Sequence, residues 1–188
     1  TVDKEVFSRV RQSARTHGIT VNDLLLASYA LALAGAAPEP SESCFPVLTS
    51  IDLRRYLSPD TYPSLANLSV AFELPVGVPR DPELPGIARQ VHDLMHECKS
   101  GHAGIGAAMR IRRECDSGFA HVRDELLDRE ERTRRGLLGK NPFFTNLGVI
   151  PEGIIDYGTP VRDAWMLGPV EYPPGFCLAA STFRGSLT

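Results

Sequence analysis

The sequence lacks the short signatures of several common classes of site. Its cysteines, Cys44, Cys98, Cys115 and Cys177, are isolated, so no pair has the CxxC spacing typical of zinc or redox sites. No GxSxG stretch is present, and the glycines of "GHAGIG" follow a predicted helix, whereas a dinucleotide-binding loop follows a strand. We therefore predict no metal site and no tightly bound cofactor.

An excess of one charge and a long apolar run are also missing. The chain has 20 basic and 23 acidic residues, a formal net charge of -3, which gives no electrostatic reason to expect nucleic acid or an anionic membrane as a partner. Its longest apolar stretch, from Leu24 to Ala37, is shorter than the roughly 18 residues of a membrane span. Isolated thiols are typical of a reducing compartment, so we expect a cytoplasmic protein without a membrane span.

What is present is the composition of a globular protein. The 188 residues are 43% hydrophobic and 23% charged, which suits a single domain over 1–188. The patterns predict helices at 2–16, 21–35, 81–99 and 119–135, and strands at 44–52, 67–76, 143–151, 163–170 and 175–183. Thr20 and Asp23 have the spacing of a helix capping box, and Asp81 with Pro82 marks another helix start. We predict an α/β fold, a two-layer sandwich in which helices pack on one face of a mixed sheet.

The last residues, "STFRGSLT", predict a hairpin whose second strand is only begun. Arg184 and Gly185 read as the turn, because glycine accepts the positive φ that tight turns need. Ser186 to Thr188 would then open a return strand of three residues, which is too short to be stable on its own. This pattern predicts that the chain is one piece of a larger protein.

Several stretches together resemble a known family. "ARTHGITVNDLLLASYALAL", "PVLTSIDLRRYL" with "LANLSVAFELPV", "FFTNLGVI" and "GFCLAASTFRGSLT" are similar, in this order, to the C-terminal half of chloramphenicol-acetyltransferase-like enzymes. The nearest groups are polyketide-associated acyltransferases, alcohol acetyltransferases and condensation domains. The resemblance implies transfer of an acyl group from a CoA or carrier-protein phosphopantetheine thioester to a hydroxyl or amine. The reaction would take place in a channel between two similar half-domains.

The catalytic signature of that family, HHxxxDG, is missing. None of the five histidines is followed by it, and the nearest stretch, "HVRDE" at His121, has its Asp at the wrong offset and no glycine. In the family this signature belongs to the N-terminal half. The resemblance therefore implies that no catalytic residue lies in this chain, that the missing half is its partner, and that the isolated chain is inactive. An acyl carrier protein and a small alcohol or amine are further expected partners.

Arg54, which follows Asp52 at the end of a predicted strand, is the first site candidate. By resemblance, its guanidinium pairs with the aspartate of the missing HHxxxDG signature and fixes the loop that holds the catalytic histidine. An arginine fork binds a carboxylate through two hydrogen bonds and tolerates burial when paired. The alternative is a local surface pair of Asp52 with Arg54 or with Arg55, which contributes little to stability.

Asn146 and Thr145 form the second candidate, since a strand interior rarely contains an asparagine. The amide of Asn146 can line the channel and donate to a developing oxyanion. The alternative is an amide that holds the turn before Gly148 or a neighbouring strand. By resemblance Asn67 also lies near the channel, although a plain turn residue is the competing interpretation.

Two hypotheses from other classes stay open. The chain can be a non-catalytic docking module for a carrier protein or a partner chain, or it can form homo-oligomers through the face that the missing half leaves open. A complete small α/β enzyme is the third hypothesis. His92 and His96 share a helix face at a spacing that suits a metal, but the sequence offers no third ligand, which favours solvated flank residues.

Overall fold

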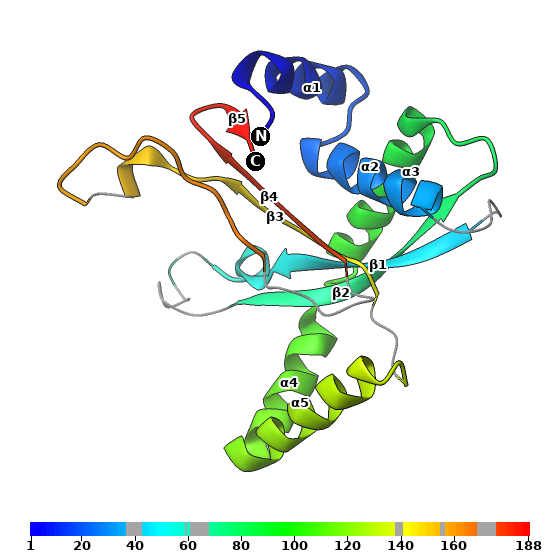
Figure 1. The fold of residues 1–188 in the computed structure, drawn as a ribbon, viewed down its shortest axis with the longest axis vertical. Coiled ribbons are helices and arrows are strands. Elements are labelled where there is room, and N and C mark those ends of the chain that lie inside the picture. Colours follow the sequence, from blue (N-terminus) through cyan, green and yellow to red (C-terminus); the bar gives the residue numbers. More distant parts are fainter. Residues whose placement is uncertain (37–42, 59, 61–67, 138–140, 155–156, 169–175) are drawn as a thin grey trace.

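The computed structural model describes residues 1–36, 43–58, 60, 68–137, 141–154, 157–168 and 176–188. Its helices are α1 (Lys4–Thr16), α2 (Val21–Ala36), α3 (Leu84–Ser100), α4 (Ile105–Asp116) and α5 (Phe119–Arg134). Its strands are β1 (Ser43–Asp52), β2 (Ser69–Val78), β3 (Phe143–Val149), β4 (Cys177–Phe183) and β5 (Ser186–Leu187), with 3₁₀ turns η1 (Leu53–Tyr56) and η2 (Glu152–Ile154) after β1 and β3. The predicted α/β class with a mixed sheet is confirmed (Figure 1).

The sheet combines antiparallel and parallel pairs in the order β2-β1-β3-β4-β5. β1 and β2 pair antiparallel along their whole length, whereas β1–β3 and β3–β4 are parallel. The turn at Arg184 and Gly185 has positive φ at both residues, 48° and 85°, and joins β4 to β5 as predicted. Val2 bridges Leu187 on the other side of β5, so the two ends of the chain lie together (Figure 1).

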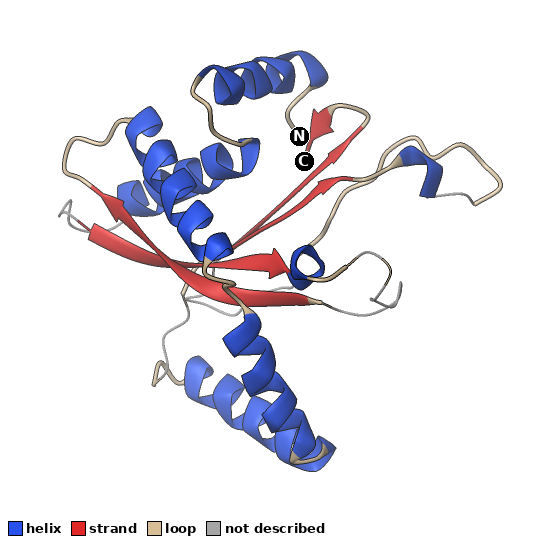
Figure 2. Ribbon diagram, turned by 180° about the vertical axis from the view of Figure 1, so that it is seen from behind, coloured by secondary structure: helices blue, strands red, loops and turns tan. Residues whose placement is uncertain are grey.

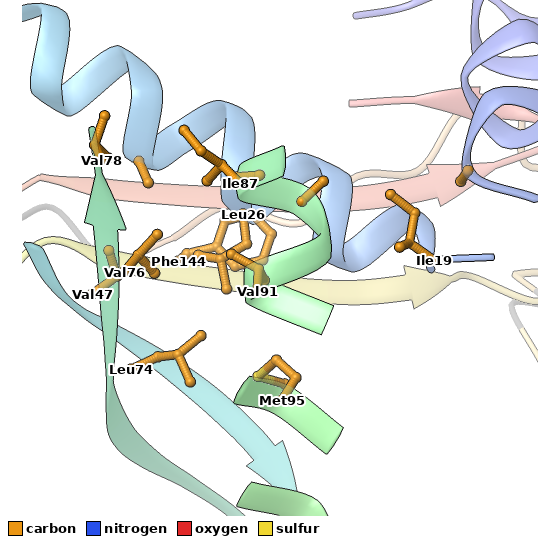
Figure 3. Close-up of a cluster of buried hydrophobic side chains, with 14 residues drawn as sticks. Ile19, Leu26, Val47, Leu74, Val76, Val78, Ile87, Val91, Met95 and Phe144 are labelled. Carbon is orange, nitrogen blue, oxygen red and sulfur yellow. The ribbon is translucent and has the colours of Figure 1, made fainter. Parts of the chain in front are cut away.

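One face of the sheet is covered by α2 and α3, and the core lies between these helices and the strands (Figure 3). Fully buried side chains come from α2 (Leu26), β1 (Val47), β2 (Leu74), α3 (Val91) and β3 (Phe144). α2 contacts α1, α3, β1, β2 and β3, which explains why its sequence is apolar on nearly every face. Its N-terminus is the predicted capping box: Thr20 N–H donates to Asp23 Oδ2 (2.9 Å) and Asp23 N–H donates to Thr20 Oγ1 (3.2 Å).

α4 and α5 form a hairpin on the opposite side of the sheet (Figures 1 and 2). The sequence pattern does not predict α4, because the glycines at 101, 104 and 106 interrupt the helical periodicity there. In the structure Gly104 takes a φ of +91° and serves as the N-cap residue, so the helix begins directly after it. Among the described residues no single helix has the length and apolar character of a membrane span; the bent pair α1–α2 meets these criteria only when both helices are taken together.

Two further boundaries differ from the prediction. α3 begins at Leu84. Its N-cap is Glu83, two residues after the predicted cap at Asp81, and Pro85 rather than Pro82 lies in its first turn. The predicted strand at 163–170 is wrong over its described part, because residues 163–168 have no regular secondary structure. Met166 N–H donates to the Ser181 hydroxyl (2.9 Å) instead of to a strand carbonyl, so this segment lies on β4 without joining the ladder.

Candidate functional site

The candidate site lies where β1 and β3 separate, which we name the strand fork: Ser50–Arg54 on one side and Thr145–Val149 on the other. The two strands are paired only at Leu48 with Phe143 and Thr49 with Phe144. Beyond this point they diverge, as Figure 1 shows. Because β1 and β3 are parallel, their carboxyl ends meet at this fork, the position where open α/β sheets place ligands.

Ser50 and Thr145 are the first residues beyond the last pair, and their hydroxyl oxygens lie 3.1 Å apart. Both side chains point away from α2 and α3, since they alternate with the buried Thr49 and Phe144 along their strands. A hydrogen bond between two hydroxyls uses one proton, and the second proton has no partner in the described part of the chain. Thr145 is buried (8% exposed) and Ser50 is half-buried, so the pair can offer one hydrogen bond from the Ser50 side of the fork.

The Ser50–Thr145 bond is expected to couple the two strands weakly. In a double-mutant cycle of Ser50→Ala and Thr145→Val, we expect a coupling free energy of about 1 kcal/mol, because a neutral hydrogen bond contributes about that much. Urea unfolding of the four proteins measures it. Thr49→Val with Ser50→Ala is the matched control, since the Thr49 side chain is buried on the other face and its effect should be additive. Additive effects of Ser50→Ala and Thr145→Val on the free energy of unfolding would contradict the hydrogen bond.

Asp52 ends β1 and Arg54 lies in η1, so both residues are on the same side of the fork as Ser50. Arg54 Nη1 donates to Asp52 Oδ1 (3.2 Å), and the Arg54 N–H donates to the same oxygen (2.9 Å). The carboxylate thus caps η1 and holds the arginine at once. The side chains are 31% and 58% exposed. This is the local pair of the alternative interpretation; the pairing of Arg54 with an aspartate of another half stays a prediction.

Asn146 points to the helix-covered face, opposite to Thr145. Its Nδ2 donates to Asn22 Oδ1 on α2 (3.3 Å), and its Oδ1 accepts from Gly148 N–H (2.8 Å). Gly148 has a φ of +77°, and the register between β3 and β4 shifts between Asn146 and Val149. These contacts bend β3 at a bulge, and the side-chain partner of Asn146 lies on α2 rather than on a neighbouring strand. A channel-lining role of Asn146 stays a prediction, and Asn67 lies outside the described residues.

Tyr29 of α2 contacts Phe176, the residue that precedes β4. Its hydroxyl donates to the Phe176 carbonyl (3.1 Å), and its ring lies 6.2 Å from that of Phe144. Burial, with a smaller contribution from the charge of Cys177, raises the pKa of Tyr29 to about 12. Tyr29 therefore remains a protonated hydrogen-bond donor throughout the neutral range.

The structure contains a histidine–carboxylate pair that the sequence does not predict. His92 Nδ1 lies 2.8 Å from Oδ2 of Asp23, a residue that is 1% exposed, and this contact joins α3 to α2. The pair lies on the helix side of the sheet, away from the open face of the fork. No signal in the sequence links the two residues, which are 69 positions apart. In the described part of the chain, no group of three or more His, Cys, Asp or Glu side chains is placed to hold a metal ion.

Comparison with known proteins places the chain in a family. Residues 1–101 match the family described as the C-terminus of phthiocerol/phthiodiolone dimycocerosyl transferase. The chain belongs to this acyltransferase C-terminal family. The match covers α1 to α3 and therefore includes Ser50, Asp52 and Arg54 of the fork. No curated protein matches the chain in sequence.

Solved structures share the fold of this family member. Polyketide synthase associated protein 5 from Mycobacterium tuberculosis is 15% identical with a TM-score of 0.58, and the match covers 99% of this chain and 44% of that one. Trichothecene 15-O-acetyltransferase TRI3 from Fusarium sporotrichioides is 14% identical with a TM-score of 0.59, covering 99% and 39%. The first condensation domain of the CDA synthetase is 12% identical with a TM-score of 0.54, covering 99% and 36%. The chain thus spans less than half the length of each.

Proposed function

We propose that this chain acts as the C-terminal half of an acyltransferase that moves an acyl group from a thioester to a hydroxyl or amine. The donor would be acyl-CoA or the phosphopantetheine thioester of a carrier protein. The membership of residues 1–101 in an acyltransferase C-terminal family carries this proposal. In it, the fork supplies one wall of the reaction channel, and the histidine base comes from the other half of the enzyme.

The exposed surface beside the fork supports a site that is shared between two halves of the enzyme. α2 and α3 bury one face of the sheet, and the segments beside the fork carry large apolar side chains that are 53% to 81% exposed: Leu147, Val149, Trp165 and Leu167. Exposed apolar surface around a hydroxyl pair suits a covering partner that excludes water from a reacting thioester. The length of the structural relatives supports a second half-domain as that partner.

The Arg54 pair gives this proposal its sharpest test. The chain alone should show no acyl transfer from acyl-CoA to alcohols or amines, and the same chain joined to an N-terminal half that carries HHxxxDG should be active. In the joined protein, Arg54→Ala should lower kcat/KM by about 10²-fold, because a misplaced catalytic loop has that effect. The stability of the chain should change by no more than about 0.5 kcal/mol, as expected for an exposed pair.

Arg55→Ala is the matched control, because Arg55 is the next residue and lies over the Tyr56 ring (5.6 Å) rather than at the Asp52 carboxylate. It should leave kcat/KM nearly unchanged. Full turnover by the isolated chain would overturn the proposal. Equal losses of kcat/KM in the Arg54→Ala and Arg55→Ala variants would contradict the role of Arg54 in this proposal.

A non-catalytic docking module is the second candidate, and the α4–α5 hairpin favours it. Among the described residues of the two helices only Thr133 is buried, while Met109, Ile111, Leu126 and Leu127 are exposed. Such a surface suits a partner chain, a carrier protein or a second copy of this chain. If the joined protein binds its partner but never transfers an acyl group, this candidate replaces the first.

A further inference from the structure

The 3₁₀ turn η1, which carries Arg54, packs against the connection between α3 and α4. We name this connection, residues 99–104, the α3–α4 turn. α3 covers one face of the sheet and α4 begins on the other, so the α3–α4 turn passes beside the end of β1 and the start of β2 (Figures 1 and 2). A Cβ on Gly104 would lie 2.8 Å from Ile51 Cγ2 and 2.5 Å from Val70 Cγ2, which shows how closely the turn approaches both strands.

Tyr56, the last residue of η1, makes the polar contact with the α3–α4 turn. Its hydroxyl oxygen lies 3.2 Å from the Lys99 carbonyl oxygen and 3.4 Å from the Ala103 carbonyl oxygen, so one O–H proton is shared between two acceptors. Lys99 lies in the last turn of α3, where carbonyl groups have no N–H partner within the helix. The half-buried Tyr56 hydroxyl satisfies such a group and ties η1 to the end of α3.

Two apolar contacts join the same two segments. The rings of Tyr56 and His102 have centroids 5.0 Å apart with 33° between their planes. Leu53, the first residue of η1, also lies against the turn, because a Cβ on Gly104 would be 3.2 Å from Leu53 Cδ2. The α3–α4 turn therefore holds both ends of η1, and Arg54 lies between these two points of contact.

The contacts of Tyr56 act on the backbone that places Arg54. The Leu57 N–H donates to the Arg54 carbonyl (3.0 Å), which closes the 3₁₀ turn, and the Arg54 N–H donates to the Asp52 carboxylate (2.9 Å). The Asp52 side chain is 58% exposed, and an exposed ion pair fixes a long side chain only weakly. The position of the Arg54 guanidinium therefore depends on how firmly the backbone of η1 is held.

We propose that Tyr56 is a positioning residue: its hydroxyl binds the α3–α4 turn and so holds η1, and with it Arg54, in one place. This inference rests on the proposed function, in which Arg54 fixes the catalytic loop of the other half of the enzyme. Tyr56 itself contacts neither the acyl donor nor the acceptor. Its effect on turnover passes through Arg54, which distinguishes it from a residue that merely stabilises the fold.

Hydrogen exchange of the isolated chain, followed by NMR, tests the contact itself. Tyr56→Phe removes the hydroxyl and keeps the ring beside His102. We expect the Leu57 amide to exchange about tenfold faster in this variant, because the loss of one hydrogen bond lets η1 open locally. Amides in the middle of the β1–β2 ladder should change by less than about twofold, since the core is untouched.

Steady-state kinetics of the protein joined to an N-terminal half with HHxxxDG tests the consequence for turnover. Tyr56→Phe should lower kcat about tenfold and leave the KM for acyl-CoA within about twofold, because a loosely held Arg54 affects the catalytic loop and not donor binding. The double variant of Tyr56→Phe and Arg54→Ala should be as active as Arg54→Ala within about twofold. Once the guanidinium is gone, its position no longer matters.

Tyr29→Phe is the matched control, because it also deletes a tyrosine hydroxyl that donates to a backbone carbonyl. The Tyr29 hydroxyl bonds to the Phe176 carbonyl (3.1 Å) and belongs to α2, which has no part in η1. This variant should leave the exchange rate of the Leu57 amide within about twofold. Any loss of kcat that it causes should multiply with the loss caused by Arg54→Ala, as independent effects do.

Three results would overturn the inference: an unchanged Leu57 exchange rate in Tyr56→Phe, equal acceleration of the ladder amides, or losses of kcat in Tyr56→Phe and Arg54→Ala that multiply. The exchange measurement does not depend on turnover. A joined protein that is inactive, with Leu57 exchange that responds to Tyr56→Phe, refutes the proposed function and leaves the contact of Tyr56 standing. An active joined protein whose kcat ignores Tyr56→Phe refutes the positioning role alone.

Discussion

Replacing Gly104 by alanine is expected to destabilise the folded chain by about 3 kcal/mol, from backbone strain and overpacking together. Gly104 has a φ of +91°, which residues with a side chain rarely adopt. An added Cβ would lie 2.5 Å from Val70 Cγ2 and 2.8 Å from Ile51 Cγ2, and both of these residues are buried. Urea unfolding followed by circular dichroism measures the change as a lower midpoint at constant m value.

Gly106→Ala provides the control for this prediction. Gly106 lies two residues later, in the first turn of α4, and a Cβ there meets open space. Alanine should be neutral or stabilising by up to about 1 kcal/mol, because it favours the helix. Similar losses in both variants would show that the hairpin tolerates no change at all, and would contradict the specific role of close approach at Gly104.

Replacing Asp23 by alanine is the second change with a large expected effect, a loss of about 3 kcal/mol. The Asp23 carboxylate accepts hydrogen bonds from Thr20 N–H and from His92, so alanine removes the helix cap and the link between α2 and α3 together. α2 underlies β1, β2 and β3, and its displacement would loosen the strand fork. Thermal and urea unfolding measure the loss.

Two further variants separate the cap from the link. Asp23→Asn keeps an oxygen for Thr20 N–H and should cost only about 1 kcal/mol. His92→Ala leaves the buried carboxylate with fewer donors and should cost about 2 kcal/mol. The double variant of Asp23→Ala and His92→Ala should be hardly less stable than Asp23→Ala alone. If the two single effects simply add, the residues do not interact as the 2.8 Å contact indicates.

Sequence patterns were informative where the stabilising contact is local. The Thr20–Asp23 capping box joins residues three apart, and the Arg184–Gly185 turn joins neighbouring strands, so both follow from short-range geometry. The predicted strand at 163–170 is wrong over its described part, because the apolar residues 164–167 do not join the sheet ladder. In the structure, Met166 bonds to a side chain instead of to a strand. α4 is absent from the prediction because Gly104 serves a close approach to the sheet, which a helix pattern cannot reveal.

In the candidate site too, the sequence indicated the local contacts and the fold decided the distant ones. Arg54 and Asp52 are two positions apart, so their pairing was an explicit alternative from the sequence, and the capping of η1 explains why it forms. Thr145 and Asn146 were predicted as one polar pair. The structure places them on opposite faces of β3, Thr145 with Ser50 and Asn146 with Asn22. Strand alternation implies this separation, but only the sheet order tells which face is open.

By itself, then, the sequence determined the α/β class, most element positions and the kinship with acyltransferases, because these depend on periodicity, capping and short motifs. The tertiary structure decided which residues meet. Ser50 reaches Thr145 across 95 positions and His92 reaches Asp23 across 69, since β1 pairs with β3 and α3 packs on α2. Such contacts arise from chain topology and packing, and a local pattern carries no information about a partner that far away.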